Sequence, residues 1–233
     1  MNSYEKSIFN MYQNCRLGTS EKCNMCRKED PELSKPISIW HIGNQYAEST
    51  HRVLFVGKAA RGSIEQDSGS INGVLDGTGV AGDLYDSVGW PFWSYTRTIA
   101  NELYGESDAW ERIAMTNMVK CNASEGEDTT TETRMQNCAE YLRRELELLC
   151  PKNIIFYTNK WYDNAVASLF DQMEDADYCD VPCGEKQMRL WKFTGKIGEH
   201  TIRVMRAGHP ERMQKADYTG QIIRFIRRED YNE

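Results

Sequence analysis

The sequence predicts an α/β fold, a three-layer α/β/α sandwich around a central, mainly parallel sheet of four strands. Four short apolar runs recur along the 233-residue chain, and longer amphipathic stretches separate them. Runs of this kind are typical of strands that crossover helices bury on both faces. The length also suits one sizeable domain with enough residues to bury a core. We therefore expect residues 1–233 to form a single domain.

The positions of these runs predict the individual elements. The predicted strands are residues 52–56, 112–117, 153–157 and 201–206. Helical spacing of apolar residues predicts helices at 3–15, 93–104, 131–149, 160–174 and 216–228. Pro151 lies just beyond the helix predicted at 131–149, where a helix-stop signal is expected.

The remaining stretches lack a regular period. Residues 20–50 form an N-terminal cysteine-bearing segment, read as a loop followed by weakly structured polar residues. Residues 62–89 are rich in Gly, Ser and Asp, which predicts a long functional loop or lid. Residues 122–131 are acidic and rich in threonine, which predicts a surface loop, and the stretch 175–199 contains the start of a hairpin-like run that spans residues 186–204.

Composition limits the location and the partners. No run of eighteen apolar residues occurs, so we expect no membrane span. The first residues lack the basic start and apolar stretch of a secretory signal, so a cytoplasmic location is expected. Cytosolic thiols stay reduced, which favours metal ligation or free thiols over disulfides. The net charge of −7 argues mildly against a nucleic-acid partner, although a local basic face matters more than the total.

Four of the eight cysteines are spaced as in a metal centre. Cys23 and Cys26 form a C-x-x-C pair, Cys121 follows a predicted strand, and Cys138 lies in a predicted helix. Two close thiols and two distant ones, each beside regular structure, suit a four-cysteine metal centre. Unrelated buried or free cysteines are the alternative, since a single C-x-x-C pair is a weak signal.

The carboxyl ends of the predicted strands carry a compact set of polar and aromatic residues. Gly57 and Lys58 follow the first strand, and Asn117 ends the second. Phe92 lies between these strands in an aromatic segment, and His209 follows the fourth strand. Because ligands bind beyond the carboxyl ends of strands in doubly wound α/β folds, we expect these side chains to converge on one edge.

The order of these motifs resembles the iron–sulfur-containing uracil-DNA glycosylases, family 4 of that superfamily. The motifs are Gly-x-Ala, Pro-Phe, Thr-Asn-x-Val-Lys-Cys, Cys-x-x-Tyr-Leu, Pro-Lys-x-Ile-Ile and His-Pro, within residues 20–228. The resemblance implies a uracil-DNA glycosylase-like domain with a 4Fe-4S cluster. Its implied ligands are Cys23, Cys26, Cys121 and Cys138. Cys15 is an alternative ligand for one of the pair, and we expect structural roles for Cys150, Cys179 and Cys183.

The resemblance also implies roles for the residues at the strand ends. Asn117 would read the flipped base, since an amide offers donors and an acceptor to a pyrimidine edge. Phe92 would stack on the base, and His209 would donate to its oxygen as negative charge builds on the leaving group. Met213 would be the apolar wedge that fills the place of the extruded nucleotide. The structural alternatives are a turn cap for Asn117 and plain packing for Phe92 and Met213.

Lys58 departs from the family pattern, whose first loop reads Gly-Glu-Ala-Pro-Gly. A lysine stands at the position of the family's glutamate, although Gly57 and Lys58 are still expected to border the base. The carboxylate that activates water must then come from the adjoining loop, where the candidates are Glu65, Asp67, Asp83 and Asp86. Residues 93–95 (WSY) replace small glycines after Pro-Phe, which predicts an altered pocket wall.

Three functions are compatible with these observations. The first is a monofunctional DNA glycosylase of base excision repair, which flips out a pyrimidine nucleotide, uracil by default, and hydrolyses its N-glycosidic bond. The second keeps this reaction but removes a modified cytosine, such as glucosylated hydroxymethylcytosine, from bacteriophage DNA as an anti-phage defence. The third is a non-catalytic iron–sulfur nucleic-acid-binding protein. The expected partner is single- or double-stranded DNA, and the protein is expected to be a monomer.

Overall fold

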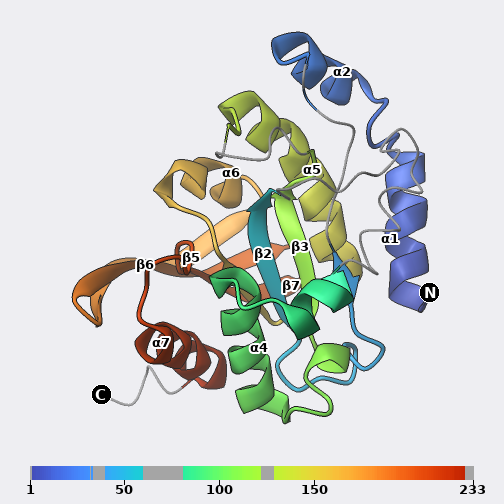
Figure 1. Ribbon diagram of the computed structural model, residues 1–233. Helices are drawn as coiled ribbons and strands as arrows, with labels where there is room; N and C mark the ends of the chain where they lie inside the picture. Colours follow the sequence, from blue (N-terminus) through green and yellow to red (C-terminus); the bar gives the residue numbers. More distant parts are fainter. Residues whose placement is uncertain (1, 32, 34–39, 60–80, 122–128, 229–233) are drawn as a thin grey trace.

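The structure has a mixed α/β fold, as the sequence predicts. It is a computed structural model that describes the chain except for residues 1, 32, 34–39, 60–80, 122–128 and 229–233. Within the described residues, helices pack on both faces of one mixed β-sheet (Figure 1). No helix in this part of the chain is long and apolar enough to cross a membrane.

Four parallel strands correspond to the four predicted runs. They are β2 (Val53–Ala59), β3 (Ala114–Val119), β4 (Asn153–Phe156) and β7 (His200–Arg206). β2 pairs with both β3 and β4, and β4 pairs with β7, all in parallel. Their carboxyl ends therefore lie at one edge of the sheet, which we call the carboxyl edge.

The prediction of a four-stranded sheet is wrong. The described sheet has seven strands in the order β1-β3-β2-β4-β7-β6-β5. The short strand β1 (His41–Ile42) pairs antiparallel with β3. At the other side, β5 (Gln172–Cys183) pairs antiparallel with β6 (Lys186–Ile197), and β6 forms an antiparallel hairpin with β7, where the sequence predicts a hairpin-like run at 186–204.

The prediction of a single helix at residues 160–174 is also wrong. This stretch forms a 3₁₀ turn (Lys160–Tyr162), the short helix α6 (Asp163–Ala167) and the beginning of β5. Its apolar residues have helical spacing, but the long backbone ladder between β5 and β6 outweighs that local preference.

Helices cover the two faces of the sheet in separate groups. α1 (Ser3–Asn14), α5 (Glu132–Leu149) and α6 pack on one face, and α4 (Pro91–Tyr104) and α7 (Lys215–Arg227) pack on the other. Successive residues of β2 divide between these faces, because side chains alternate along a strand. Leu54 and Val56 join the core beneath α5, and Phe55 joins the core beneath α4.

The segments predicted as loops contain further helices. Helix α2 (Glu21–Glu29) lies within the cysteine-bearing segment 20–50, where the sequence predicts a loop. Residues 81–87, at the end of the predicted loop 62–89, are also helical. A 3₁₀ turn (Trp110–Arg112) precedes β3. Most of the predicted loops 62–89 and 122–131 lies outside the described residues.

Candidate functional site

A cavity of about 310 Å³ opens at the carboxyl edge, and we call it the base pocket. The ends of β2 and β3, the beginning of α4 and the loop after β7 line it. All five residues that the sequence places at the strand ends belong to its lining: Gly57, Lys58, Phe92, Asn117 and His209. The volume lies near the lower end of the roughly 300–1,000 Å³ of small-molecule sites, which suits a ligand of the size of one nucleobase.

Gly57 brings Asn117 and Phe92 together. The parallel register of β2 and β3 pairs Gly57 with Asn117. A Cβ atom added to Gly57 would lie 2.4 Å from Asn117 Oδ1 and 3.2 Å from Phe92 Cε2. The absence of a side chain at this position therefore lets the amide and the aromatic ring meet at the floor of the pocket. Asn117 itself is only 6% exposed.

Aromatic contacts fix the ring of Phe92. Trp90 is the N-cap of α4 and Pro91 occupies its first turn, where proline is favoured because no N–H partner is needed there. The ring of Phe92 then makes edge-to-face contacts with Trp93 and Tyr157, at centroid distances of 5.0 and 5.4 Å. Such pairs are the preferred geometry of aromatic rings. The indole of Trp90 is 62% exposed, and it lines the cavity.

The loop after β7 is held in shape by two tyrosine hydroxyls. Tyr218 donates to the carbonyl of Gly208 at 2.7 Å, and Tyr95 donates to the carbonyl of Met213 at 2.7 Å. Gly208 has a φ of +76°, a conformation that a glycine adopts without steric cost. The loop between these anchors carries His209, which therefore enters the base pocket from a restrained backbone.

A hydrogen bond to Nδ1 of His209 indicates the tautomer of the neutral ring. The backbone N–H of Glu211 donates to His209 Nδ1 at 3.2 Å. In a neutral imidazole, one ring nitrogen accepts and the other carries the proton. The neutral ring therefore carries its proton on Nε2, which makes this atom a hydrogen-bond donor.

Glu211 is a pocket residue that the sequence analysis missed. It lines the base pocket with His209, and its Oε2 lies 3.9 Å from His209 Nδ1. Its Oε1 also lies 3.9 Å from Arg212 Nε. The only signal in the sequence is an acidic residue two positions after the histidine. The structure thus places a carboxylate beside the histidine, whereas the sequence predicts one in the loop 62–89.

The four carboxylates proposed from the sequence have different outcomes. Glu65 and Asp67 lie outside the described residues. Asp83 and Asp86 are exposed on the helical segment 81–87, where Leu84 lines the pocket. Among the described residues, Glu211 is the acidic residue that lines this cavity. Met213, the proposed wedge, is half-buried against the core beneath α4. It lies at the end of the loop after β7 that carries His209, which we call the histidine loop.

The four candidate metal-ligand cysteines are all buried. Cys23 and Cys26 lie one turn apart on α2, whose N-cap Ser20 accepts from the backbone N–H of Cys23. Cys121 directly follows the β3 region and packs with Cys26, and Cys138 lies on α5. α2, the end of β3 and α5 thus supply these thiols from three distant parts of the sequence.

Hydrogen-bond donors point at three of these sulfur atoms. The backbone N–H of Gly18 donates to Cys23 Sγ at 3.2 Å, and Asn137 Nδ2 donates to Cys26 Sγ at 3.2 Å. The backbone N–H of Lys120 donates to Cys138 Sγ at 3.5 Å. Hydrogen bonds of this kind orient side chains that act as metal ligands.

The sulfur atoms are close enough to influence one another's ionisation. Burial raises the pKa of Cys121 far above its ordinary value, and repulsion from Cys138, Cys23 and Cys26 raises it further. Burial likewise raises the pKa of Cys138 to about 12, although the N–H of Lys120 acts in the opposite direction. Four thiolates at this position therefore require a compensating positive charge, which metal ions supply.

The arrangement does not match a site for one ion. Among the residues that the structure describes, no group of three or more His, Cys, Asp or Glu side chains is placed to hold a metal ion. A single zinc ion holds its sulfur ligands about 2.3 Å away, so the sulfurs must crowd together.

A buried ion pair lies between this cysteine group and the base pocket. Lys120 is fully buried, and its Nζ lies 2.6 Å from Glu145 Oε1. The same Nζ donates to Thr116 Oγ1 at 2.8 Å and to the carbonyl of Asn117 at 2.6 Å. Thr116 and Tyr12 both donate to the Glu145 carboxylate. Lys120 therefore fixes the main chain of Asn117, the residue at the floor of the pocket.

Comparison with known proteins adds no family assignment. A scan of the chain against models of protein families found no match, and a search among curated proteins also found none. Function must therefore be inferred from the geometry and chemistry of the site.

Proposed function

We propose that the protein is a DNA glycosylase that extrudes a pyrimidine nucleotide and hydrolyses its N-glycosidic bond, with uracil as the default base. The observation that carries this proposal is the meeting of Asn117, Phe92 and His209 in one pocket of about 310 Å³ at the carboxyl edge. An amide, an aromatic ring and a hydrogen-bond donor are the groups that hold a flipped pyrimidine and stabilise its departure.

Each group has a separate part in the reaction. The amide of Asn117 pairs with the edge of the base, and the ring of Phe92 stacks on its face. The bond between the sugar C1′ and the base nitrogen breaks, and the electron pair leaves with the base. His209 Nε2–H donates to the base oxygen as this charge develops, so the interaction strengthens in the transition state. A water molecule adds to C1′ and loses a proton to the solvent, and the departed base anion takes up a proton in exchange. The products are the free base and an abasic site in the DNA.

Glu211 is the described carboxylate best placed to assist the water. Its carboxylate is held beside His209 in the pocket lining, and a carboxylate can also stabilise the positive charge that develops on the sugar. We expect Glu211→Gln to lower the single-turnover rate about ten-fold, below the ~10²-fold typical of general bases, because its side chain is 62% exposed. The exposed Glu199, on the hairpin turn before β7, provides a matched control as Glu199→Gln. An unchanged rate for Glu211→Gln would return the role to Glu65, Asp67, Asp83 or Asp86.

The proposal is tested by incubating the protein with a duplex that contains uracil, beside a panel of duplexes that contain modified cytosines. Release of free uracil and alkali-sensitive abasic sites supports the default substrate. Release of a modified cytosine alone supports the second function. Binding of all duplexes without base release supports the non-catalytic alternative and overturns the enzyme proposal.

Three pocket residues favour a modified cytosine as the second candidate substrate. Lys58 lines the pocket in place of the family's glutamate, and it adds a hydrogen-bond donor at the base site. The exposed indole of Trp90, together with Trp93, lines the same cavity and offers apolar surface for a bulky substituent. Such a substituent on the cytosine ring would carry hydroxyl groups that accept from Lys58.

Asn117→Asp is expected to change base preference. Asparagine can donate to the O4 atom of uracil, whereas an ionised carboxylate can only accept, for example from the amine of a cytosine. The loss of one paired, buried hydrogen bond costs about 1–3 kcal/mol, so activity on uracil should fall about ten-fold or more. Activity on cytosine derivatives should fall less. Rates for both substrates with Asn117→Asp and Asn117→Ala check this, and equal rates for all three proteins would make Asn117 a turn residue.

We also propose that Cys23, Cys26, Cys121 and Cys138 hold a 4Fe-4S cluster. A cluster with four thiolate ligands has no open coordination site, so it would stabilise the fold by linking α2, β3 and α5. Anaerobically purified protein should be brown and contain about four irons per chain. Cys138→Ala should lose iron, whereas Cys150→Ala, which removes a thiol outside this group, should retain it. Colourless protein with one zinc ion per chain would replace the cluster with a structural zinc site.

A further inference from the structure

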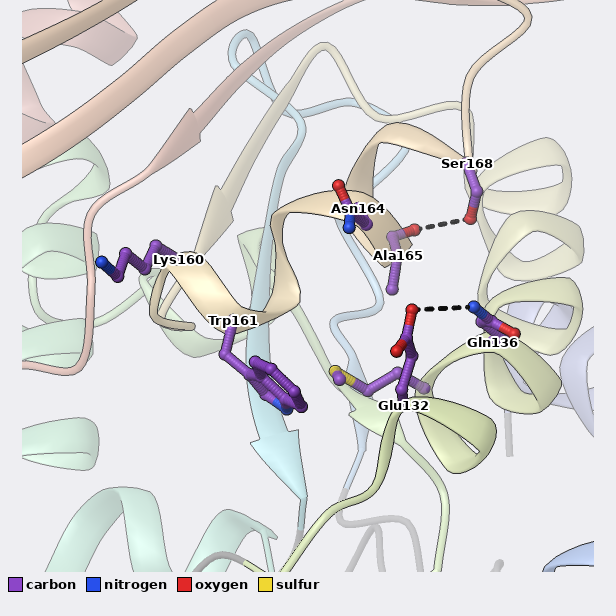
Figure 2. Close-up of a pocket in the computed structure, with 8 residues that line it drawn as sticks. Glu132, Gln136, Lys160, Trp161, Asn164, Ala165 and Ser168 are labelled. Atoms are coloured by element: carbon purple, nitrogen blue, oxygen red, sulfur yellow. Dashed lines mark hydrogen bonds between the residues drawn. The ribbon is translucent and has the colours of Figure 1, made fainter.

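A second cavity of about 420 Å³ lies at the carboxyl edge, and we call it the tryptophan groove. Its lining comes from the first turn of α5, the 3₁₀ turn after β4, and α6. Figure 2 shows Lys160 and Glu132 at opposite sides of the groove, with Trp161 between them and Asn164 on the adjoining helix. No described residue of the groove belongs to the base pocket.

Trp161 is presented to solvent from a rigid turn. Its indole is 59% exposed, which is unusual for so large an apolar side chain. The side chain of Asn159 accepts from the backbone N–H of Trp161 at 3.0 Å, and Tyr162, the next residue, is fully buried. The backbone on both sides of Trp161 is therefore fixed, so little conformational freedom is lost when a ligand stacks on the ring.

The groove and the base pocket flank neighbouring strands of the sheet. β2 and β4 pair in parallel, and the N–H of Tyr157 donates to the carbonyl of Val56 at 2.9 Å. The carboxyl end of β2 lines the base pocket, together with α4. The chain after β4 lines the groove, together with α5 and α6 on the opposite face of the sheet. A DNA strand that follows the carboxyl edge can therefore reach both cavities.

We infer that the tryptophan groove binds a second, unpaired nucleotide of the DNA strand whose base enters the base pocket. This inference rests on the proposed glycosylase function. Extrusion of one nucleotide deprives its neighbour of a stacking partner, and the exposed indole of Trp161 replaces that partner. Base–aromatic stacking tolerates any base, because every base has a π-face. Lys160, at the side of the groove away from Glu132, is placed to contact the phosphate of this nucleotide.

The test uses a single-stranded oligonucleotide with a tetrahydrofuran abasic analogue at its centre and 2-aminopurine at successive positions on either side. We expect the protein to quench the fluorescence at one position beside the analogue. Trp161→Ala should abolish this quenching and weaken binding about ten-fold, whereas Trp161→Phe should retain most of both. Lys160→Gln should reduce the slope of log affinity against log salt by about 0.7, the value for one phosphate contact on a single strand.

Tyr178→Ala is the matched control, because it removes another exposed aromatic ring, on β5, that does not line the groove. It should change neither binding nor quenching. A protein that excises its base normally but shows no Trp161-dependent quenching overturns the groove inference alone. A protein that excises no base but quenches through Trp161 overturns the proposed function and leaves the groove as a single-strand site. Equal weakening of duplex and single-strand binding by Trp161→Ala also overturns the inference, since a fully paired duplex offers no free base to stack.

Discussion

His209→Ala is expected to slow the chemical step about a hundred-fold or more. The ring lines the base pocket, and the N–H of Glu211 donates to its Nδ1, so the neutral ring carries its donor proton on Nε2. In the proposed reaction, this donor meets the base oxygen when negative charge develops there. Removal of one donor of this kind typically costs about 10²–10³ in rate. Single-turnover cleavage under saturating protein measures the chemical step without a contribution from product release.

DNA affinity should change little in the same variant. Phosphate contacts position a protein on DNA, and exposed cations such as Arg212 and Lys215 lie near the histidine loop and are unaffected by this substitution. His200→Ala is the matched control, because His200 begins β7, the strand whose other end leads to His209. An equal loss of rate in both variants, or a loss of affinity that accounts for the slower cleavage of His209→Ala, would contradict a role in the chemical step.

The base pocket was predictable from the sequence because strand geometry determines its position. The runs at 52–56, 112–117 and 201–206 are apolar enough to identify buried strands, and parallel strands bring their carboxyl ends together. The residues after these ends therefore meet in one cavity, as expected for Asn117 and His209. The sequence does not show why position 57 is a glycine. In the structure, the side chains of Asn117 and Phe92 lie where a Cβ atom at this position would be.

The features that were missed depend on tertiary contacts. β5 is exposed along nearly its whole length, so its residues show no alternation that would identify a strand. Helix α2 is polar, and its identity depends on the burial of Cys23 and Cys26 against distant parts of the chain. Glu211 enters the pocket because the loop turns at Gly208, a conformation that sequence spacing does not specify.

Lys120→Met is expected to lower the free energy of unfolding by about 3–5 kcal/mol. The substitution leaves the Glu145 carboxylate buried without its cation, and removal of one partner of a buried pair carries a penalty of this size. Burial and the neighbouring Glu145 raise the pKa of Tyr12 far above its usual value. Tyr12 therefore stays protonated and can only donate to Glu145, so it cannot replace the lost positive charge. Equilibrium urea unfolding of the variant and the parent protein under the same conditions measures the difference.

Two further variants separate the effect of the uncompensated Glu145 charge on stability from the effect of losing any lysine. Lys22→Met breaks the exposed ion pair with Glu140 and should cost less than about 1 kcal/mol, since exposed pairs contribute little. The double variant carries Lys120→Met and Glu145→Gln. Its glutamine removes the buried charge but keeps a carbonyl acceptor for Tyr12 and Thr116. This variant should recover a substantial part of the lost stability. A double variant no more stable than Lys120→Met would show that the uncompensated charge is not the cause.

Recovered stability should not restore full activity. Lys120 donates directly to the carbonyl of Asn117, and neither methionine nor the glutamine at 145 replaces this contact. Small displacements of a positioned group cost large factors in rate, so base excision by the double variant should stay below that of the parent protein at equal folded fraction. A stable double variant with the parent's rate would assign Lys120 to the fold alone. A stable double variant with a lower rate would show that Lys120 positions the amide of Asn117.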